Sequence, residues 1–143
     1  MDKPIALHKI APIKAASEVY VIRDGQVLMF KRGKDAPHFP GFWVGPGGHV
    51  DEHENFLSAA IREVFEETGI TISLNEIKLK AIAIHQRPDK NATWILPVFL
   101  AKLELHQEII SSSEGEAQWI KIEELAKMDK VLPHAKYYFD PEF

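Results

Sequence analysis

The chain has no cysteine among its 143 residues, which excludes disulfides, thiolate metal ligands and a cysteine nucleophile. An excess of basic charge is also missing. The formal net charge is -4 and the pI is about 6.0, so we expect no stable nucleic-acid partner. No apolar run approaches the roughly 20 residues that a membrane-spanning helix requires. Residues 1–14 contain charges and prolines in place of the apolar stretch of a signal peptide. We therefore expect a cytoplasmic protein without a membrane partner.

The residues that are present suit one globular domain over residues 1–143. Apolar residues make up 45% and charged residues 27% of the chain, as in ordinary globular proteins, and the length is enough to bury a core. The expected strands cover residues 17–22, 26–30, 42–44, 77–86, 93–104 and 117–122, and the expected helices cover residues 55–68 and 123–128. Strands interrupted by one long helix and a later short one predict an α/β sandwich.

Two local signals refine this prediction. Asp24 and Gly25 form the dipeptide that is typical of a tight β-hairpin, so they predict a turn between the first two strands. Pro97 lies inside the long apolar run at residues 93–104. Because proline donates no hydrogen bond to a neighbouring strand, it indicates an edge strand or a bulge there.

Three glutamates gather on one side of the helix expected at residues 55–68. At about 100° per residue, Glu63, Glu66 and Glu67 fall within one arc. The apolar side chains expected on the opposite, buried side are those of Leu57, Ile61, Val64 and Phe65. Two carboxylates about 5 Å apart repel by about 3 kcal/mol at an effective dielectric near 20, which a divalent cation would offset. Oxygen ligands without cysteine favour Mg²⁺ or Mn²⁺ over zinc.

An acidic arc on a surface helix is most often only a solvated face. Its surroundings favour a site here. Ala59 and Ala60 put no bulky side chain beside the arc, and the glycine-rich segment at residues 45–48 precedes the helix, where backbone must approach something closely. Gly69 stands where a helix commonly ends in a left-handed residue.

Residues 48–70 match the signature of the Nudix hydrolases at every specified position. Gly48 is followed by five residues, Glu54, seven residues and then Arg62-Glu63-Val64-Phe65-Glu66-Glu67-Thr68-Gly69-Ile70. The chain therefore resembles the Nudix family, including its MutT-like members. The resemblance implies an α/β/α sandwich with a mixed sheet and a loop-helix made by the signature. It also implies hydrolysis of a nucleoside diphosphate linked to another group, by water attacking a phosphorus of the pyrophosphate.

The same resemblance implies roles for individual residues. Glu63, Glu66 and Glu67 match the metal ligands of the family, with the backbone carbonyl of Gly47 as a fourth. Alternatively, Glu63 or Glu67 would accept the proton from the attacking water, and the sequence leaves this choice open. The residues that would shape the motif are Gly48, Glu54, Arg62 and Gly69, with Glu54 and Arg62 paired to lock the loop onto the helix.

Residues outside the signature complete the expected site. Glu114 or Glu116 would supply a further metal ligand, although a Ser- and Glu-rich loop can equally be merely solvated. Arg32 stands at a strand end where relatives place a phosphate-contacting residue, against the alternative of simple exposure. The aromatic side chains that offer a face to a nucleobase, or else anchor the core, are Phe39, Phe42 and Trp43, of which we assign Trp43 to the substrate.

The substrate is inferred by elimination. His85 stands where relatives resembling ADP-ribose hydrolases carry a proline, and Pro88 follows three residues later. The tyrosine of dinucleoside-polyphosphate hydrolases and the Phe-Pro-Gly-Gly of the coenzyme A type are both missing. A (d)NTP or oxidised (d)NTP, cleaved to a nucleoside monophosphate and pyrophosphate, fits best. The alternatives are an ADP-ribose or nucleotide-sugar pyrophosphatase and a non-catalytic nucleotide-binding domain. Monomer and homodimer both stay open.

Overall fold

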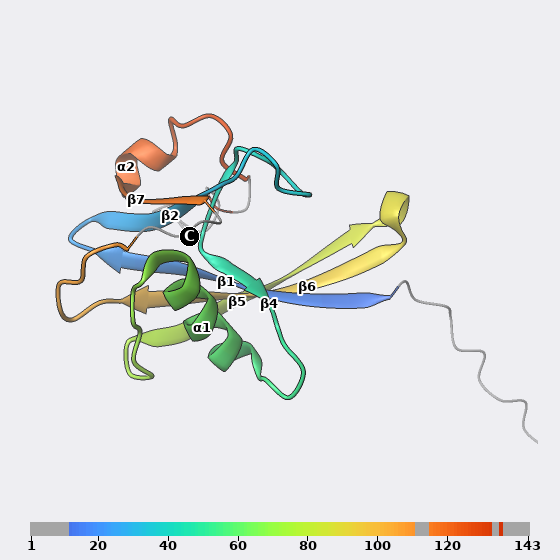
Figure 1. Cartoon of the computed structure of the whole chain (residues 1–143), viewed down its shortest axis with the longest axis horizontal. Coiled ribbons are helices and arrows are strands. Elements are labelled where there is room, and N and C mark those ends of the chain that lie inside the picture. Colours follow the sequence, from blue (N-terminus) through green and yellow to red (C-terminus); the bar gives the residue numbers. More distant parts are fainter. Residues whose placement is uncertain (1–11, 111–114, 133–134, 136–143) are drawn as a thin grey trace, which may run out of the picture.

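A mixed β-sheet with helices on both faces forms the body of the protein (Figure 1). The computed structural model describes residues 12–110, 115–132 and 135. Its strands are β1 (Ile13–Arg23), β2 (Gln26–Arg32), β3 (Trp43–Val44), β4 (Gly47–His49), β5 (Ile77–Arg87), β6 (Ala92–Lys102) and β7 (Gly115–Lys121). Its helices are α1 (Phe56–Thr68), α2 (Ile122–Leu125) and the 3-10 turn η1 (Pro88–Lys90). No helix in these ranges has the length and apolarity needed to cross a membrane.

The two long strands β1 and β2 separate within the sheet, and a short glycine-rich segment at residues 45–48 lies between them. The order is β3-β2-β1-β6-β5, with β7 on the free side of β2 and β6 running parallel to β1. β1 and β2 leave the Asp24-Gly25 hairpin as a pair and then diverge. β3 pairs with β2 and β4 pairs with β1, so the turn between β3 and β4 lies where the two long strands separate. The predicted hairpin is confirmed, with positive φ at both Asp24 and Gly25.

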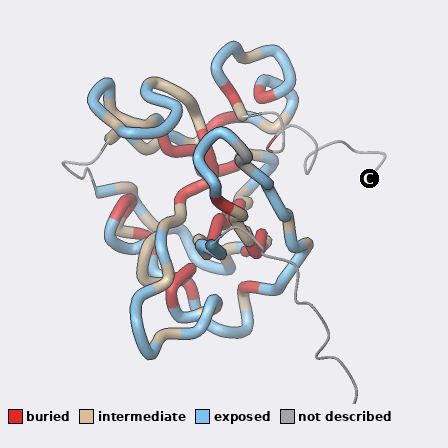
Figure 2. The backbone as a smooth tube through the Cα atoms, turned by 90° about the vertical axis from the view of Figure 1, so that its right-hand side faces the viewer, coloured by how far each residue is buried: buried red, intermediate tan, exposed pale blue. Residues whose placement is uncertain are grey.

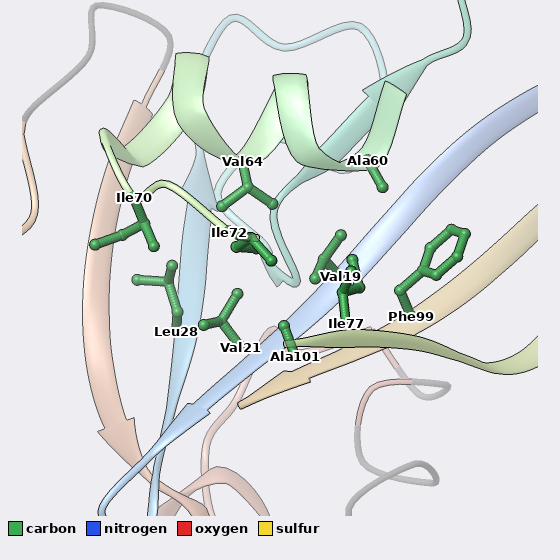
Figure 3. Close-up of a cluster of buried hydrophobic side chains, with 10 residues drawn as sticks. All are labelled: Val19, Val21, Leu28, Ala60, Val64, Ile70, Ile72, Ile77, Phe99 and Ala101. Atoms are coloured by element: carbon green, nitrogen blue, oxygen red, sulfur yellow. The ribbon is translucent and has the colours of Figure 1, made fainter. Parts of the chain in front are cut away.

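Two hydrophobic clusters make the core, one on each face of the sheet. The cluster under α1 contains Val19, Val21, Leu28, Ala60, Val64, Ile70, Ile72, Ile77, Phe99 and Ala101 (Figure 3). The cluster on the other face contains Tyr20, Val27, Met29, Val98, Ile120, Leu125, Val131 and Ala135. Successive residues of β1 alternate between the two clusters, as the pleat of a strand requires. Buried backbone accordingly lies in the middle of the molecule and exposed backbone in the loops (Figure 2). The α/β prediction is confirmed.

The strand predictions need two corrections. β1 begins at Ile13, not at residue 17, because its first residues pair in parallel with β6 from Thr93 onward. Of the two alternatives that Pro97 indicated, an edge strand or a bulge, the edge position is excluded, since β6 has β1 on one side and β5 on the other. Pro97 is tolerated because the pairing with β1 is interrupted between Ile95 and Val98. An irregularity of register also lies close by, in β5 between Leu79 and Ala81.

The ends of α1 follow the sequence signals, whereas its orientation differs from the prediction. The side chain of Asn55 accepts a hydrogen bond from the Ser58 N–H and caps the start, and Gly69 ends the helix with φ of 77°. Phe65 was expected to be buried and is 55% exposed, whereas Glu67 is only 7% exposed. The helix is turned so that part of its acidic arc adjoins the buried face. The reason is that α1 packs closely against β4 as well as against the apolar sheet. The later helix is also shorter than predicted and ends at Leu125.

Candidate active site

The glycine turn, by which we mean Gly45 and Pro46 between β3 and β4 together with Gly47, the first residue of β4, is packed tightly against β1. The Val19 N–H donates to the Pro46 carbonyl at 2.9 Å. A Cβ atom added to Gly47 would lie 1.9 Å from the Ser17 carbonyl oxygen, and one added to Gly45 would lie 2.8 Å from the Val19 carbonyl oxygen. Because these neighbours are backbone atoms, they cannot move aside as the end of a side chain can. Only glycine fits this close approach.

Two glutamates of α1 meet this turn and the residue after it. The Gly47 N–H donates to Oε1 of Glu67 at 2.7 Å. A Cβ atom added to Gly48 would lie 2.5 Å from the carboxyl carbon of Glu63. Glu66, one helical turn after Glu63, has a half-exposed side chain. Glu63 and Glu67 therefore lie against residues 47–48, whereas the side chain of Glu66 is half exposed to solvent.

Arg62 lies between the loop before α1 and the acidic arc. Its Nε donates to Oε2 of Glu54 at 2.7 Å and one Nη donates to Oε1 at 2.8 Å, which is a bidentate pair. The other Nη donates to Glu63 at 2.8 Å and to Glu66 at 3.2 Å. The guanidinium also donates to the His49 carbonyl at 3.1 Å. Arg62 thus joins loop and helix and compensates negative charge within the arc itself.

The pair with Arg62 changes the titration of both groups. The hydrogen bonds from Arg62, and then the one from the Asp51 N–H, lower the pKa of Glu54 from 4.5 to about 2. The bond to Glu54, with help from Glu63, raises the pKa of Arg62 above its usual value. Both groups are therefore charged near neutral pH, and the loop stays tied to the helix.

A basic cleft of about 500 Å³ opens beside β3. Its lining consists of Lys31, Arg32, Gly33, Lys34, Gly41, Trp43, Gly115, Glu116, Asp129 and Lys130. Four cationic side chains against two acidic ones give the cleft a positive balance that suits phosphate groups. Arg32 is held by a 2.6 Å hydrogen bond from its Nε to the His38 carbonyl. Nζ of Lys31 lies 5.9 Å from the centre of the Trp43 ring.

A family model described as the NUDIX domain matches residues 13–141. The chain belongs to the Nudix family. Its fold is similar to that of a MutT NUDIX hydrolase from Burkholderia pseudomallei, with a TM-score of 0.75 and 27% identity, covering 89% of this chain and 95% of the other. Nudix enzymes are pyrophosphohydrolases that act on phosphorus-containing anhydrides. The chain is therefore a Nudix hydrolase for nucleoside diphosphate-linked substrates.

Relatives by sequence agree on the family and differ in their names. The uncharacterized Nudix hydrolase YvcI of Bacillus subtilis is 26% identical over 136 residues, 84% of this chain and 83% of that protein. A putative 8-oxo-dGTP diphosphatase of the same organism is 37% identical over 70 residues, 49% of this chain and 42% of that protein. The m7GpppN-mRNA hydrolase NUDT17 of Danio rerio is 44% identical over 52 residues, 36% of this chain. This match spans only 17% of that protein's length.

Nudix hydrolases generally use divalent metal ions, and the donor set here fits such an ion. Glu63, Glu66 and Glu67 offer carboxylate oxygens, which are the hard ligands that Mg²⁺ and Mn²⁺ prefer. The backbone of residues 47–48 also lies close to Glu63 and Glu67. As the side chains stand, no group of three His, Cys, Asp or Glu within the described ranges is arranged around a metal position. In this arrangement Arg62 donates hydrogen bonds to Glu63 and Glu66, so these two carboxylates are directed towards the guanidinium.

The remaining predicted site residues fall in three places. Glu114 lies outside the described residues. Glu116 is exposed on β7, where it pairs with Lys31 and lines the basic cleft together with Arg32 and Trp43. The aromatic residues Phe39 and Phe42 contact each other edge to face, with centroids 5.7 Å apart, and are not part of the cleft lining.

Glu18 is a residue near the glycine turn that the sequence reasoning missed. It lies on β1 and is 5% exposed, and its Oε1 accepts hydrogen bonds from the Tyr20 hydroxyl at 2.7 Å and the Gly45 N–H at 2.9 Å. A signal was present in the sequence. A single acidic residue inside an apolar strand that is buried on both faces is unusual, because a buried carboxylate needs partners.

Proposed function

We propose that this Nudix hydrolase cleaves nucleoside triphosphates, oxidised ones included, to a nucleoside monophosphate and pyrophosphate, with Mg²⁺ or Mn²⁺ as its cofactor. The observation that carries this proposal is that Glu63 and Glu67 lie against residues 47–48. The preceding strand, β3, contributes Trp43 to the lining of the basic cleft. The similarity to a putative 8-oxo-dGTP diphosphatase supports the choice of substrate.

The carboxylates define the reacting end of this site. A divalent ion held by Glu63, Glu66, Glu67 and the Gly47 carbonyl would neutralise charge on the non-bridging phosphate oxygens. Glu63 or Glu67 takes the proton from the attacking water. The water oxygen forms a bond to phosphorus, the bridging P–O bond breaks, and its electron pair leaves with the departing phosphate group. The glutamate then returns the proton to solvent.

The basic cleft holds the rest of the nucleotide. Arg32 is fixed in direction by the His38 carbonyl, so its remaining N–H groups are pre-organised for phosphate oxygens. The indole of Trp43 gives the base or the ribose an apolar surface. Arg62 and Glu54 hold the loop and helix in register, which keeps the carboxylates within reach of the phosphorus.

A substrate panel tests the proposal directly. Steady-state rates are measured with Mg²⁺ or Mn²⁺ for the (d)NTPs, 8-oxo-dGTP, ADP-ribose, a nucleotide sugar and a capped dinucleotide. We expect the highest kcat/KM for a nucleoside triphosphate, no turnover after chelation, and pyrophosphate as the second product. Turnover of ADP-ribose or the nucleotide sugar alone would contradict the substrate assignment. Calorimetric binding of nucleotides without any product would favour the non-catalytic alternative.

Isotope labelling identifies which phosphorus is attacked. In water enriched in ¹⁸O, attack at the α-phosphorus puts the label in the nucleoside monophosphate. Attack at the β-phosphorus puts it in pyrophosphate. Because both products come from one bond cleavage, mass spectrometry of a single reaction separates the two routes. Release of orthophosphate from the triphosphate would contradict both of them.

A further inference from the structure

Glu18 is a buried carboxylate that the proposed chemistry leaves without a role. Its neighbours in sequence, Val19 and Val21, belong to the cluster beneath α1, and Tyr20 belongs to the cluster on the other face. Since side chains alternate along a strand, Glu18 points to the face away from α1. A Cβ atom added to Gly45 would lie 3.0 Å from Cγ of Glu18 and 3.0 Å from the Tyr20 ring, which confirms this placement.

The contacts of Glu18 lead to the glycine turn. Its Oε1 accepts the Gly45 N–H, which begins the turn, and Oε1 of Glu67 accepts the Gly47 N–H, which ends it. Glu67 reaches the turn from α1, whereas Glu18 reaches it from the opposite face of the sheet. Two carboxylates from distant parts of the chain therefore hold the two ends of one three-residue turn.

This turn needs such support. β4 pairs with β1 at only three residue pairs, at Ala16, Ser17 and Glu18, and two of the three turn residues are glycines. The Tyr20 hydroxyl donates to the same oxygen of Glu18 that accepts the Gly45 N–H, which adds to the stability of the core around the carboxylate. Any shift of Gly45 would move Gly47 and, with it, the hydrogen-bond partner of Glu67.

We infer that Glu18 is a positioning residue for the metal site. It holds the Gly45-Pro46-Gly47 turn from the face of the sheet away from α1. In this way it determines the positions of the Gly47 carbonyl and of the Glu67 carboxylate. The inference rests on the proposed function, because it assigns the turn to the metal site. Partners of this kind typically change metal affinity by about 10- to 100-fold when they are removed.

The competing explanation is that Glu18 only satisfies buried polar groups of the core. Four variants separate the two explanations. Glu18→Gln keeps a carbonyl oxygen that can accept both hydrogen bonds. Glu18→Leu removes the acceptor, and Glu18→Asp keeps the charge but withdraws it by one methylene. Tyr20→Phe removes the hydroxyl and leaves the bond from Gly45 in place. Leu125→Ala, in the same core cluster but away from the turn, controls for lost stability.

The experiment measures Mn²⁺ affinity of the full chain by electron paramagnetic resonance, together with Tm, kcat and KM. We expect Glu18→Leu and Glu18→Asp to weaken Mn²⁺ binding about 10-fold or more and to lower kcat more than they raise KM. Glu18→Gln should restore both, within about 3-fold of the wild type. Tyr20→Phe and Leu125→Ala should lower Tm with little change in Mn²⁺ affinity. If Glu18→Leu does not fold, Glu18→Asp decides the question.

The outcomes distinguish this inference from the proposed function. Wild-type Mn²⁺ affinity in Glu18→Asp or Glu18→Leu overturns the positioning role alone, provided that the wild type binds the ion and hydrolyses nucleotides. A loss of affinity in Leu125→Ala as large as that in Glu18→Asp also overturns it, since general destabilisation would then explain the effect. A wild-type chain that binds no Mn²⁺ overturns both proposals.

Discussion

Arg62 donates two hydrogen bonds to the carboxylate of Glu54, from Nε at 2.7 Å and from an Nη at 2.8 Å. Oε1 of Glu54 also accepts the Asp51 N–H, so the carboxylate ties together the loop and the second turn of α1. The remaining Nη of Arg62 reaches Glu63 and Glu66. One guanidinium therefore fixes the loop and orients two of the acidic side chains at the same time.

The fork geometry of this pair predicts that lysine cannot replace Arg62. In Arg62→Lys a single ammonium cannot hold both oxygens of Glu54 and also reach Glu63. We expect kcat/KM to fall about 10- to 100-fold, because small displacements of positioned groups cost that much, with a modest loss of Tm. Steady-state kinetics and hydrogen exchange at residues 49–55 measure the effect. Arg23→Lys is the matched control, since Arg23 contacts Trp119 and Gln107 instead, and its activity should be unchanged.

The lowered pKa of Glu54 predicts a loss of stability in acid. The folded-state pKa is about 2 and the ordinary value is 4.5, so between these values the unfolded chain binds more protons than the folded one. The contribution of Glu54 is then complete above about pH 4.5 and is lost as the pH falls towards 2. Urea unfolding at a series of pH values should show a shallower decline for Glu54→Gln than for the wild type. Parallel curves for the two proteins would contradict the prediction. Glu124→Gln, on an exposed residue of α2, should follow the wild type.

The sequence predicted local structure well where the signal lies within a few neighbouring residues. The left-handed Gly69 and the Asp24-Gly25 turn both follow from short-range chemistry, and both are present. The acidic arc likewise follows from helical periodicity. These features required no knowledge of the rest of the chain.

Predictions that depended on distant partners were less accurate. Phe65 lies on the apolar side of the helix by periodicity, yet β4 approaches α1 from the acidic side and leaves Phe65 exposed. Pro97 lies in an inner strand, where it is tolerated because the pairing of β6 with β1 is interrupted at that point. Glu18 contacts Gly45, which is 27 residues further along the chain. In each case the segment of sequence does not reveal which distant residue its side chains contact.

The two neighbouring glycines of β4 should respond to alanine in different ways. In Gly47→Ala the new Cβ meets the backbone of Ser17 at 1.9 Å, so β1 and β4 must separate and Tm should fall sharply. In Gly48→Ala the new Cβ meets the carboxylate of Glu63, which can rotate away. That variant should keep most of its stability and lose activity, because Glu63 leaves its position. Thermal melts and kcat together test this contrast, and equal losses of Tm in both variants would contradict it.

The proposed metal ligands predict a loss of rate without a loss of fold. Glu67→Gln keeps an oxygen to accept the Gly47 N–H, and Glu66 is half exposed, so both variants should melt close to the wild type. Removing one charge-stabilising group from a site of this kind typically costs about 10²- to 10³-fold in kcat. We expect such a loss in Glu66→Gln and in Glu67→Gln. Glu123→Gln on α2 is the control with unchanged rate. Wild-type kcat in both arc variants would remove the metal-site assignment.

The basic cleft predicts that Arg32 contributes to binding more than to the chemical step. Arg32→Ala removes one of four cations from the lining and also the hydrogen bond to the His38 carbonyl that orders the loop. We expect KM for a nucleoside triphosphate to rise about 10-fold, as for the loss of a charged hydrogen-bond partner, with a smaller change in kcat. The difference in KM between Arg32→Ala and the wild type should be smaller in high salt, because salt screens the attraction between Arg32 and the phosphates in the wild type. Lys90→Ala, at the far end of the β5–β6 hairpin, should leave KM unchanged. An unchanged KM in Arg32→Ala at low salt would place the phosphates elsewhere, and the same measurement on Lys34→Ala and Lys130→Ala would then locate them.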